Sequence, residues 1–177
     1  MSYATPQNLL QWYGAKELAQ TATPDDLVVV PAQLMRLTIE GGNRDAFSLE
    51  EIASADKALE RITAALSEAT LLIESYISRR YELPITDTVV QGSPLPRSCG
   101  AMARRLLYDD AVPQEVEKRY EHTLGWLRDL ANNRADLNLN TTSQGQVGVG
   151  LADFENRERI FDNTLLQGFI TPRNYQS

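Results

Sequence analysis

Reactive and metal-binding side chains are scarce in this sequence. Its 177 residues include one cysteine, Cys99, and one histidine, His122. One cysteine cannot form an intrachain disulfide, which favours a reducing compartment. No second histidine or cysteine is present to complete a catalytic triad or a zinc site. We therefore expect neither an enzyme nor a cofactor, with Cys99 an inert thiol in the core and His122 a solvated or packed residue on a helix face.

Sequence signals of other enzymes, secreted proteins and membrane proteins are also missing. The sequence has no Walker loop, no dinucleotide-binding fingerprint and no HExxH motif. No apolar run approaches the roughly 20 residues that cross a bilayer. Residues 1–10 lack the basic and apolar regions of a signal peptide. The sequence therefore predicts a soluble protein without membrane contact.

The composition favours one folded domain with extensions. Apolar residues make up 42% of the chain and charged residues 23%, which is close to the globular norm and predicts a packed core. The net charge of −7 opposes the release of counterions that drives tight binding to phosphate backbones. Sequence-independent binding to nucleic acid is therefore disfavoured, whereas a DNA path with repelling walls is compatible with this charge.

Five segments carry the apolar spacing or the capping residues of helices. The first two are the residues between Thr5 and Gly14 and a further one or two turns over 15–22. The third is a long helix that begins at Ser48 with a capping box and runs over 56–80 until Pro84. The last two are a helix over 97–111 and a helix that Pro113 opens and that reaches Ala131. The short connection near Val112 predicts that the last two form a helical hairpin.

Two further segments have no clear pattern. In the segment 27–39, three valines favour a strand, but Pro31 and the spacing of the later apolar residues also suit a helix, so it is left unassigned. The segment 85–96 is rich in turn-forming residues and is predicted to be a loop.

The helical segments together predict an all-α fold, a small helical bundle with a long central helix, a helical hairpin and an extended C-terminal tail. Six apolar residues share the stripes of the long helix and the hairpin, and we expect them to be buried there. They are Ile62, Leu66, Ile73, Leu106, Leu124 and Leu127.

The C-terminal part of the chain has a different composition. Residues 138–152 contain no charged residue and three glycines, which is typical of a flexible linker. Apolar residues return over 154–169, where they need a surface to bind. We predict a helical domain over residues 1–137, with a variable insert at 26–55, and an extended linker and docking arm over 138–177.

Paired charges could suggest chemistry or phosphate binding. Adjacent residues on a helix do not face the same point, so the acidic pairs 25–26, 50–51 and 109–110 are better explained as residues at helix ends than as paired catalytic carboxylates. The basic pairs are Arg79 with Arg80 and Arg104 with Arg105. They are diluted by acidic residues, so salt bridges at the surface or at an interface are favoured over phosphate contacts.

Six sequence motifs occur in an order that resembles a known family. They are Tyr3-Ala4-Thr5-Pro6, the segment from Tyr76 to Pro84 (YISRRYELP), the segment from Ala103 to Tyr108 (ARRLLY), the segment from Pro113 to Glu121 (PQEVEKRYE), the segment from Trp126 to Leu130 (WLRDL) and the segment from Arg159 to Leu165 (RIFDNTL). In these motifs the chain resembles the Mu-like phage head-tail connector family, also described as head completion or adaptor proteins. The segment 26–45 is longer than the corresponding connection in that family.

The resemblance implies a structural protein of a tailed phage. Such a protein assembles as a ring of twelve copies below the portal, joins the head to the tail and continues the DNA channel, through which the genome passes without sequence-specific binding. The implied partners are the portal protein, tail-side connector or tail terminator proteins, and further copies of the chain. The implied location is the neck of the virion, after assembly in the cytoplasm of the bacterial host.

Within this family framework, the C-terminal arm is the expected docking element. The residues predicted to bind portal or a neighbouring subunit are Phe154, Arg159, Ile160, Phe161, Leu165, Leu166 and Phe169. The four arginines of the basic pairs are a possible second interface.

Two other functions compete with this interpretation. A helical packaging accessory or regulator would bind nucleic acid through the four arginines, and a salt-dependent shift with duplex DNA would favour it. A hydrolase would use the scattered acidic residues with a metal, and we rank it last because no ligand spacing supports it.

Overall fold

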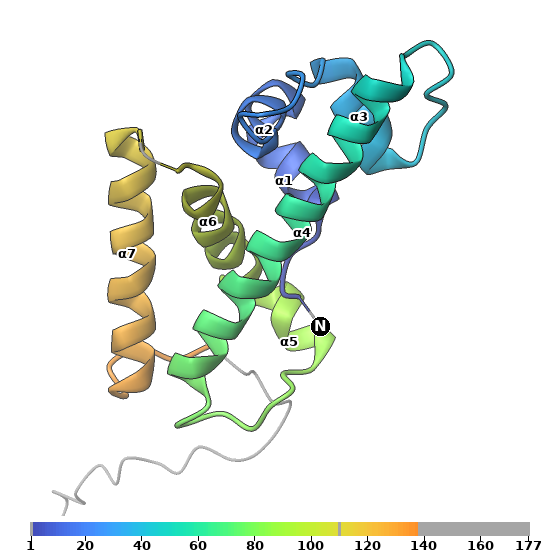
Figure 1. Cartoon of the computed structure of the whole chain (residues 1–177). Helices are drawn as coiled ribbons and strands as arrows, with labels where there is room; N and C mark the ends of the chain where they lie inside the picture. Colours follow the sequence, from blue (N-terminus) through green and yellow to red (C-terminus); the bar gives the residue numbers. More distant parts are fainter. Residues whose placement is uncertain (1, 110, 138–177) are drawn as a thin grey trace, which may run out of the picture. The chain divides into compact units, whose positions relative to one another are not determined.

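The computed structural model describes residues 2–109 and 111–137, and within these ranges it consists of seven α-helices and no β-strand (Figure 1). This confirms the predicted all-α fold with a long central helix. The helices are α1 (Pro6–Tyr13), α2 (Ala15–Ala22), α3 (Ala32–Glu40), α4 (Leu49–Ile77), α5 (Asp87–Gly92), α6 (Leu95–Leu107) and α7 (Gln114–Ala131). The predicted arm 138–177 lies outside the described residues.

The first two helices follow their local signals. Thr5 caps α1 by accepting a hydrogen bond from the backbone N–H of Asn8, whose side chain in turn accepts one from the N–H of Thr5. Pro6 occupies the first turn, where its missing N–H costs nothing. Gly14 separates α1 from α2 with φ of +83°, a value that favours glycine.

The segment 27–39, which the sequence left unassigned, contains α3. Residues 28–30 do not form a strand; the chain enters the helix at Pro31 and leaves it at Gly41, which is left-handed with φ of +72°. Three residues of α3 are buried in the core, namely Leu34, Met35 and Ile39. The predicted insert 26–55 therefore includes a helix that packs on α2 and α4, together with the first turns of α4.

Helix α4 is a single uninterrupted helix of 29 residues, roughly 43 Å long at 1.5 Å per residue. The predicted capping box is present: Ser48 accepts from the N–H of Glu51, and the Glu51 carboxylate accepts from the N–H of Ser48. Asp56 lies inside this helix, although its residue type would also suit a helix cap. The helix ends at Ile77, three residues before the predicted boundary at Arg80.

The prediction of a loop over 85–96 is wrong. Residues 87–92 form the short helix α5, and α6 begins at Leu95. The two prolines of this segment lie at the entrance to α6, where Pro94 is the N-cap and Pro96 is in the first turn, a place where proline is tolerated. At its other end α6 stops at Leu107 and not at Ala111, because Tyr108 is already extended.

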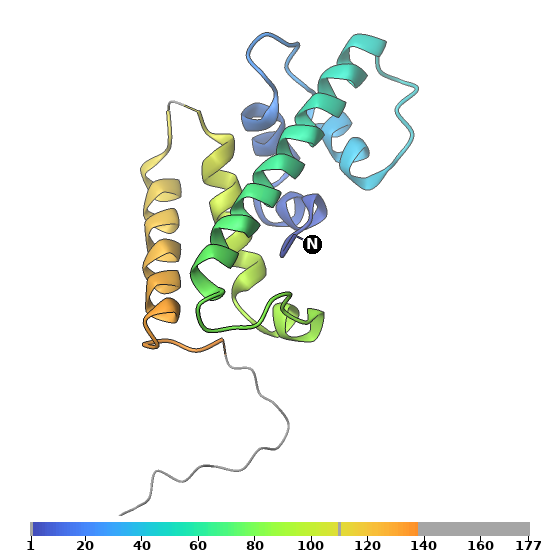
Figure 2. The ribbon, with the colours of Figure 1, turned by 60° about the horizontal axis from the view of Figure 1, so that its bottom comes forward.

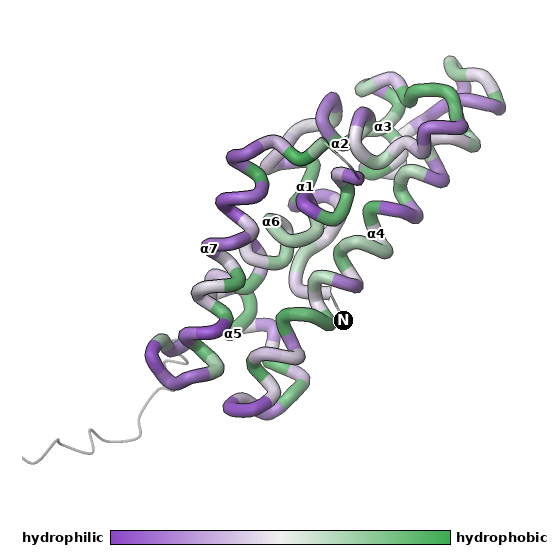
Figure 3. The backbone as a smooth tube through the Cα atoms, turned by 60° about the vertical axis from the view of Figure 1, so that its left-hand side comes forward, coloured by the Kyte–Doolittle hydropathy of each residue, from purple (hydrophilic) through white to green (hydrophobic). Residues whose placement is uncertain are grey.

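Helices α6 and α7 form the predicted hairpin, and both pack against α4. Figures 1 and 2 show α7 beside α6, with the C-terminal ends of α4 and α7 at the same end of the molecule. Coloured by hydropathy, α4 alternates between hydrophobic and hydrophilic residues along its length (Figure 3). This alternation is expected of a helix with one buried and one exposed face.

The core is larger than the sequence predicted. Ile62, Leu66, Ile73 and Leu127 are buried as expected. Leu106 and Leu124 are only partly buried and pack at the edge of the core, so their assignment to the buried set was wrong. The buried faces of α6 and α7 are instead completed by Leu107, Thr123 and Leu130.

Helices α1 to α3 also contribute to this core, although the predicted set contained none of their residues. Their fully buried large side chains are Leu9, Leu18, Leu34 and Met35. The long helix is thus covered by the hairpin and by the N-terminal helices.

Candidate interaction surfaces

Within residues 2–109 and 111–137 no group of three or more His, Cys, Asp or Glu side chains is arranged to hold a metal ion. Cys99 is buried beside Thr70, with 3.5 Å between its sulfur and the Thr70 hydroxyl oxygen. Burial raises the pKa of the Cys99 thiol, which keeps it protonated and unreactive. His122 is exposed on α7. Both residues therefore have the structural roles that the sequence predicted.

The acidic pairs do not converge on one site. Glu50 and Glu51 lie in the first turn of α4, where negative charge is favourable. Residues 25–26 lie in the connection between α2 and α3. Asp109 follows α6 and accepts hydrogen bonds of 2.6 Å from Arg61 on α4. Asp110 is outside the described residues.

Three of the four arginines singled out by the sequence are held in ion pairs within the chain. Arg104 pairs with Glu17 and Arg105 with Glu117. Arg80 pairs with Asp136 at 2.9 Å and also donates to the backbone carbonyl of Ala135. These pairs connect α6 to α2, α6 to α7, and the end of α4 to the end of the described chain, so they fix helices against one another.

Arg104 is the centre of a small network. Its guanidinium lies 4.5 Å from the ring centroid of Tyr13, and Glu17 accepts a further hydrogen bond of 3.2 Å from the hydroxyl of Tyr108. Burial lowers the pKa of Arg104, but the hydrogen bond and the charge of Glu17 outweigh this effect and the pKa is raised overall. Burial and then the charge of Glu17 also raise the pKa of Tyr108.

A second cation–aromatic contact joins α6 to α1, and the sequence predicted neither of the two contacts. The guanidinium of Arg97 lies 4.3 Å from the ring centroid of Trp12. The ring can lie here because α6 has a glycine below it: a Cβ added to Gly100 would be 2.4 Å from the Cζ3 atom of Trp12. Trp12 and Gly100 are 88 positions apart, so no local pattern indicates this close approach of α1 and α6.

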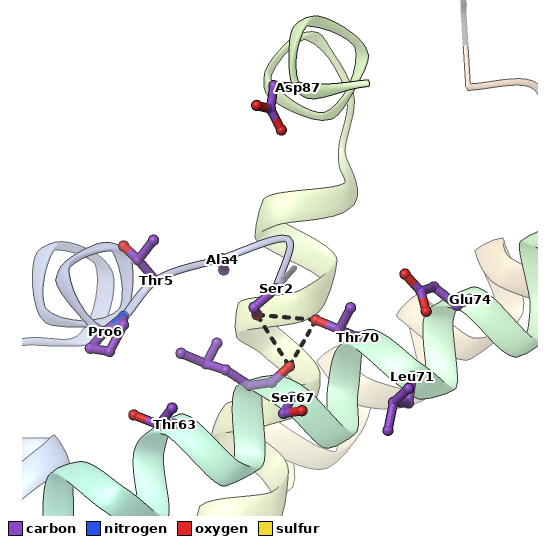
Figure 4. Close-up of a pocket in the computed structure, with 11 residues that line it drawn as sticks. Ser2, Ala4, Thr5, Pro6, Thr63, Ser67, Thr70, Leu71, Glu74 and Asp87 are labelled. Carbon is purple, nitrogen blue, oxygen red and sulfur yellow. Dashed lines mark hydrogen bonds between the residues drawn. The ribbon is translucent and has the colours of Figure 1, made fainter. Parts of the chain in front are cut away.

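The N-terminal residues border a groove of about 530 Å³ along α4 (Figure 4). The hydroxyl of Ser2 lies 3.1 Å from that of Thr70 and donates to the carbonyl of Leu66 at 3.4 Å, while the backbone N–H of Tyr3 donates to Thr70 at 3.3 Å. The chain before α1 is thereby fastened to α4. The wall of the groove includes Leu71, whose side chain is 65% exposed.

A smaller groove of about 340 Å³ lies where the C-terminal ends of α4 and α7 run side by side. It is lined by Ser75, Tyr76, Arg79, Arg128, Ala131 and Asn132. Arg79, the remaining arginine of the basic pairs, therefore lines the same groove as Arg128. Within the described part of the chain neither of these two arginines forms a salt bridge, and no acidic residue lines the groove.

Large apolar side chains are exposed at few places. Among the described residues they are Val28, Val29, Leu49 and Leu71. Leu49 is the most exposed, at 87%, and stands at the first position of α4. Such residues are candidates for contact with a partner. The predicted docking residues, Phe154, Arg159, Ile160, Phe161, Leu165, Leu166 and Phe169, lie outside the described residues, so their role stays a prediction.

The family of the chain follows from comparison with known proteins. A family model described as "Bacteriophage Mu, Gp36" matches residues 3–152. The chain belongs to this family. Its relatives include the "Mu-like prophage FluMu protein gp36" of Haemophilus influenzae, which is 27% identical over 122 residues, covering 69% of the chain and 83% of the relative. "Gene product J" of Escherichia phage Mu is 26% identical over 107 residues, covering 60% of the chain and 73% of that protein.

Membership in the Gp36 family agrees with the first five motifs that suggested a Mu-like phage protein, whereas the sixth, 159–165, lies beyond the matched residues. The matched region extends from the Tyr3 motif through all seven helices and into the linker predicted over 138–152. None of the helices in the described ranges is both long and apolar enough to span a membrane.

Proposed function

We propose that this Gp36-family protein is a head-tail connector subunit of a tailed phage. In this proposal it forms a ring of twelve copies below the portal, joins the head to the tail and continues the DNA channel. Its partners are the portal protein, tail-side connector or tail terminator proteins and other copies of itself, and its location is the neck of the virion.

The observation that carries the proposal is the family match over residues 3–152, which makes the chain a Mu-like phage protein. The architecture supports a structural role for it. Several ionisable residues of the described region fix helices against one another, as in the pairs of Arg104 with Glu17 and Arg61 with Asp109. A rigid helical unit with exposed apolar residues at separate places suits assembly better than catalysis.

The charge of the chain supports the passage of DNA. The net charge of −7 is compatible with channel walls that repel phosphate, past which DNA would slide without being held. The competing nucleic-acid binder would need the four basic-pair arginines, but Arg80, Arg104 and Arg105 already pair with carboxylates. Their positive charge is compensated within the chain, which favours the connector over that alternative.

In the same proposal the arm 138–177 docks on the portal or on a neighbouring subunit. Its apolar residues, from Phe154 to Phe169, would leave water on docking and gain about 25 cal/mol for each Å² buried. That gain has to exceed the cost of ordering the linker, so docking requires a partner with a complementary groove.

The test is co-sedimentation of the purified full-length chain with portal complexes of its phage. We expect stoichiometric binding by the full chain and a large loss of affinity when residues 154–177 are deleted. A chain that stays monomeric and never co-sediments with portal, at low or high salt, would refute the connector role. Full binding by the truncated chain would refute the docking role of the arm alone.

A further inference from the structure

The groove between the ends of α4 and α7 has the chemistry of a protein-binding site. Two guanidinium groups border it, from Arg79 just beyond α4 and from Arg128 in the last turn of α7. Tyr76 and Ala131 also line the groove and supply apolar surface. Arginine and tyrosine are the residues that most often dominate binding energy at protein interfaces.

A ligand for this groove must bring both carboxylate and apolar groups. Arginine binds carboxylates through charge-assisted hydrogen bonds, and the neighbouring Arg80 donates one such bond to Asp136 at 2.9 Å. Phosphate would satisfy the two arginines but would leave the surface of Tyr76 and Ala131 without a partner. An acidic protein segment with an exposed aliphatic side chain fits all of these features.

The chain itself carries such a segment at the opposite end of α4. Leu49 is 87% exposed at the first position of the helix, next to Glu50, which is exposed and forms no salt bridge within the described residues. Asp45, also exposed, lies four residues before Leu49. We refer to Asp45, Leu49 and Glu50 as the acidic corner.

The acidic corner cannot reach the groove of its own subunit. Leu49 and Tyr76 are 27 residues apart on one continuous helix, which places them roughly 40 Å apart at 1.5 Å per residue. Figures 1 and 2 show the start of α4 and its end at opposite ends of the folded unit. A contact between the corner and the groove therefore requires two copies of the chain.

We propose that the acidic corner of one copy binds the groove of Arg79, Tyr76 and Arg128 on the next copy. The Glu50 and Asp45 carboxylates pair with the two guanidinium groups, and Leu49 packs on Tyr76 and Ala131. This inference rests on the proposed ring, because it names the surfaces that join neighbouring subunits. In the proposed ring the contact is made once between each pair of neighbours, head-to-tail, and it generates a closed ring or a filament. The same contact made twice about a two-fold axis would give a symmetric dimer, a result that would contradict the ring arrangement.

Two sets of substitutions on exposed residues test this contact. The groove variant is Arg79→Glu with Arg128→Glu, and the corner variant is Leu49→Ala with Glu50→Lys. Control variants reverse charges elsewhere, namely Lys16→Glu with Lys118→Glu, and Glu68→Lys, all at exposed positions. Circular dichroism is used to check that each variant retains its helices.

Self-association of the full chain is measured by sedimentation, alone and in the presence of portal complexes. We expect each variant to associate at least about tenfold more weakly than the unaltered chain and than the control variants, as for removal of paired charges at an interface. An equimolar mixture of the two variants retains one intact contact, between the corner of the groove variant and the groove of the corner variant. The mixture should therefore give dimers and nothing larger.

Three other outcomes distinguish failure of the inferred contact from failure of the connector role. If the unaltered chain assembles and both variants assemble equally well, the inferred contact is wrong while the connector role stands. If the chain never assembles, alone or on portal, the connector role fails and the contact fails with it. If the groove variant loses affinity for a short DNA duplex while its assembly is unchanged, the groove is a phosphate site and the inferred contact is overturned.

Discussion

Replacement of Gly100 by alanine probes the packing of α1 on α6. Gly100 is buried in α6, and a Cβ at this position would lie 2.4 Å from Cζ3 and 2.8 Å from Cε3 of Trp12. Alanine therefore requires the indole ring to move. The ring is partly buried and has the guanidinium of Arg97 on it, so its movement also disturbs the cation–aromatic contact.

Two opposing effects set the size of the change in stability. Alanine in the interior of a helix is favoured over glycine by roughly 0.5–1 kcal/mol. Overpacking of a filled site costs about 1–3 kcal/mol. Gly100→Ala should therefore lie between neutral and about 2.5 kcal/mol destabilising. Gly125 in α7 is the matched control because a Cβ there meets no atom within 4 Å, so Gly125→Ala should stabilise by the helix effect alone.

The assay is urea unfolding followed by circular dichroism for both alanine variants, repeated in a Trp12→Ala background. We expect the difference between Gly100→Ala and Gly125→Ala to be about 1–3 kcal/mol and to disappear when the indole is removed. Equal stabilisation by both substitutions in the unaltered background would refute the close packing of Trp12 on α6.

Three further predictions concern stability. Leu66→Ala should cost about 2–5 kcal/mol because Leu66 is fully buried, whereas Leu124→Ala at the edge of the core should cost clearly less; equal losses of unfolding free energy would contradict the described core. Ser48→Ala removes the cap of α4 and should lower the unfolding free energy by about 1 kcal/mol in the same assay, and no change would argue against the capping box. Burial and then Glu74 raise the pKa of Tyr3 to about 12. Since unfolding brings Tyr3 back to its usual pKa near 10, stability should be complete below about pH 10 and fall between pH 10 and 12. Tyr3→Phe should reduce this loss, and an unchanged pH profile would refute the buried environment of Tyr3.

The features that the sequence predicted are those with local signals. Residues that are close together in the sequence encode the capping box of Ser48, the apolar stripe of α4 and the hairpin around Pro113. Helix α5 and the start of α6 were missed because Pro94 and Pro96 were interpreted as turn residues. Both instead lie at the entrance to a helix.

Other features depend on contacts between distant parts of the chain. Arg104 and Glu17 are 87 positions apart, and their pairing follows only from the packing of α2 and α6 on the same helix, α4. The burial of Leu107 in preference to Leu106 is similar, because neighbouring helix positions differ by about 100° and the packing of α4 and α7 decides which one faces inward. Family resemblance supplied the phage origin, which composition and spacing alone did not indicate.

We propose that this Gp36-family protein is a ring subunit of the phage neck. The most direct measurement is electron cryomicroscopy of purified tailed particles, with the chain located in the density by a tag on it. We predict a closed ring of twelve copies of this chain between the portal and the tail, with DNA on its axis. Complete, infectious tailed particles whose neck contains no copy of the chain would contradict the account.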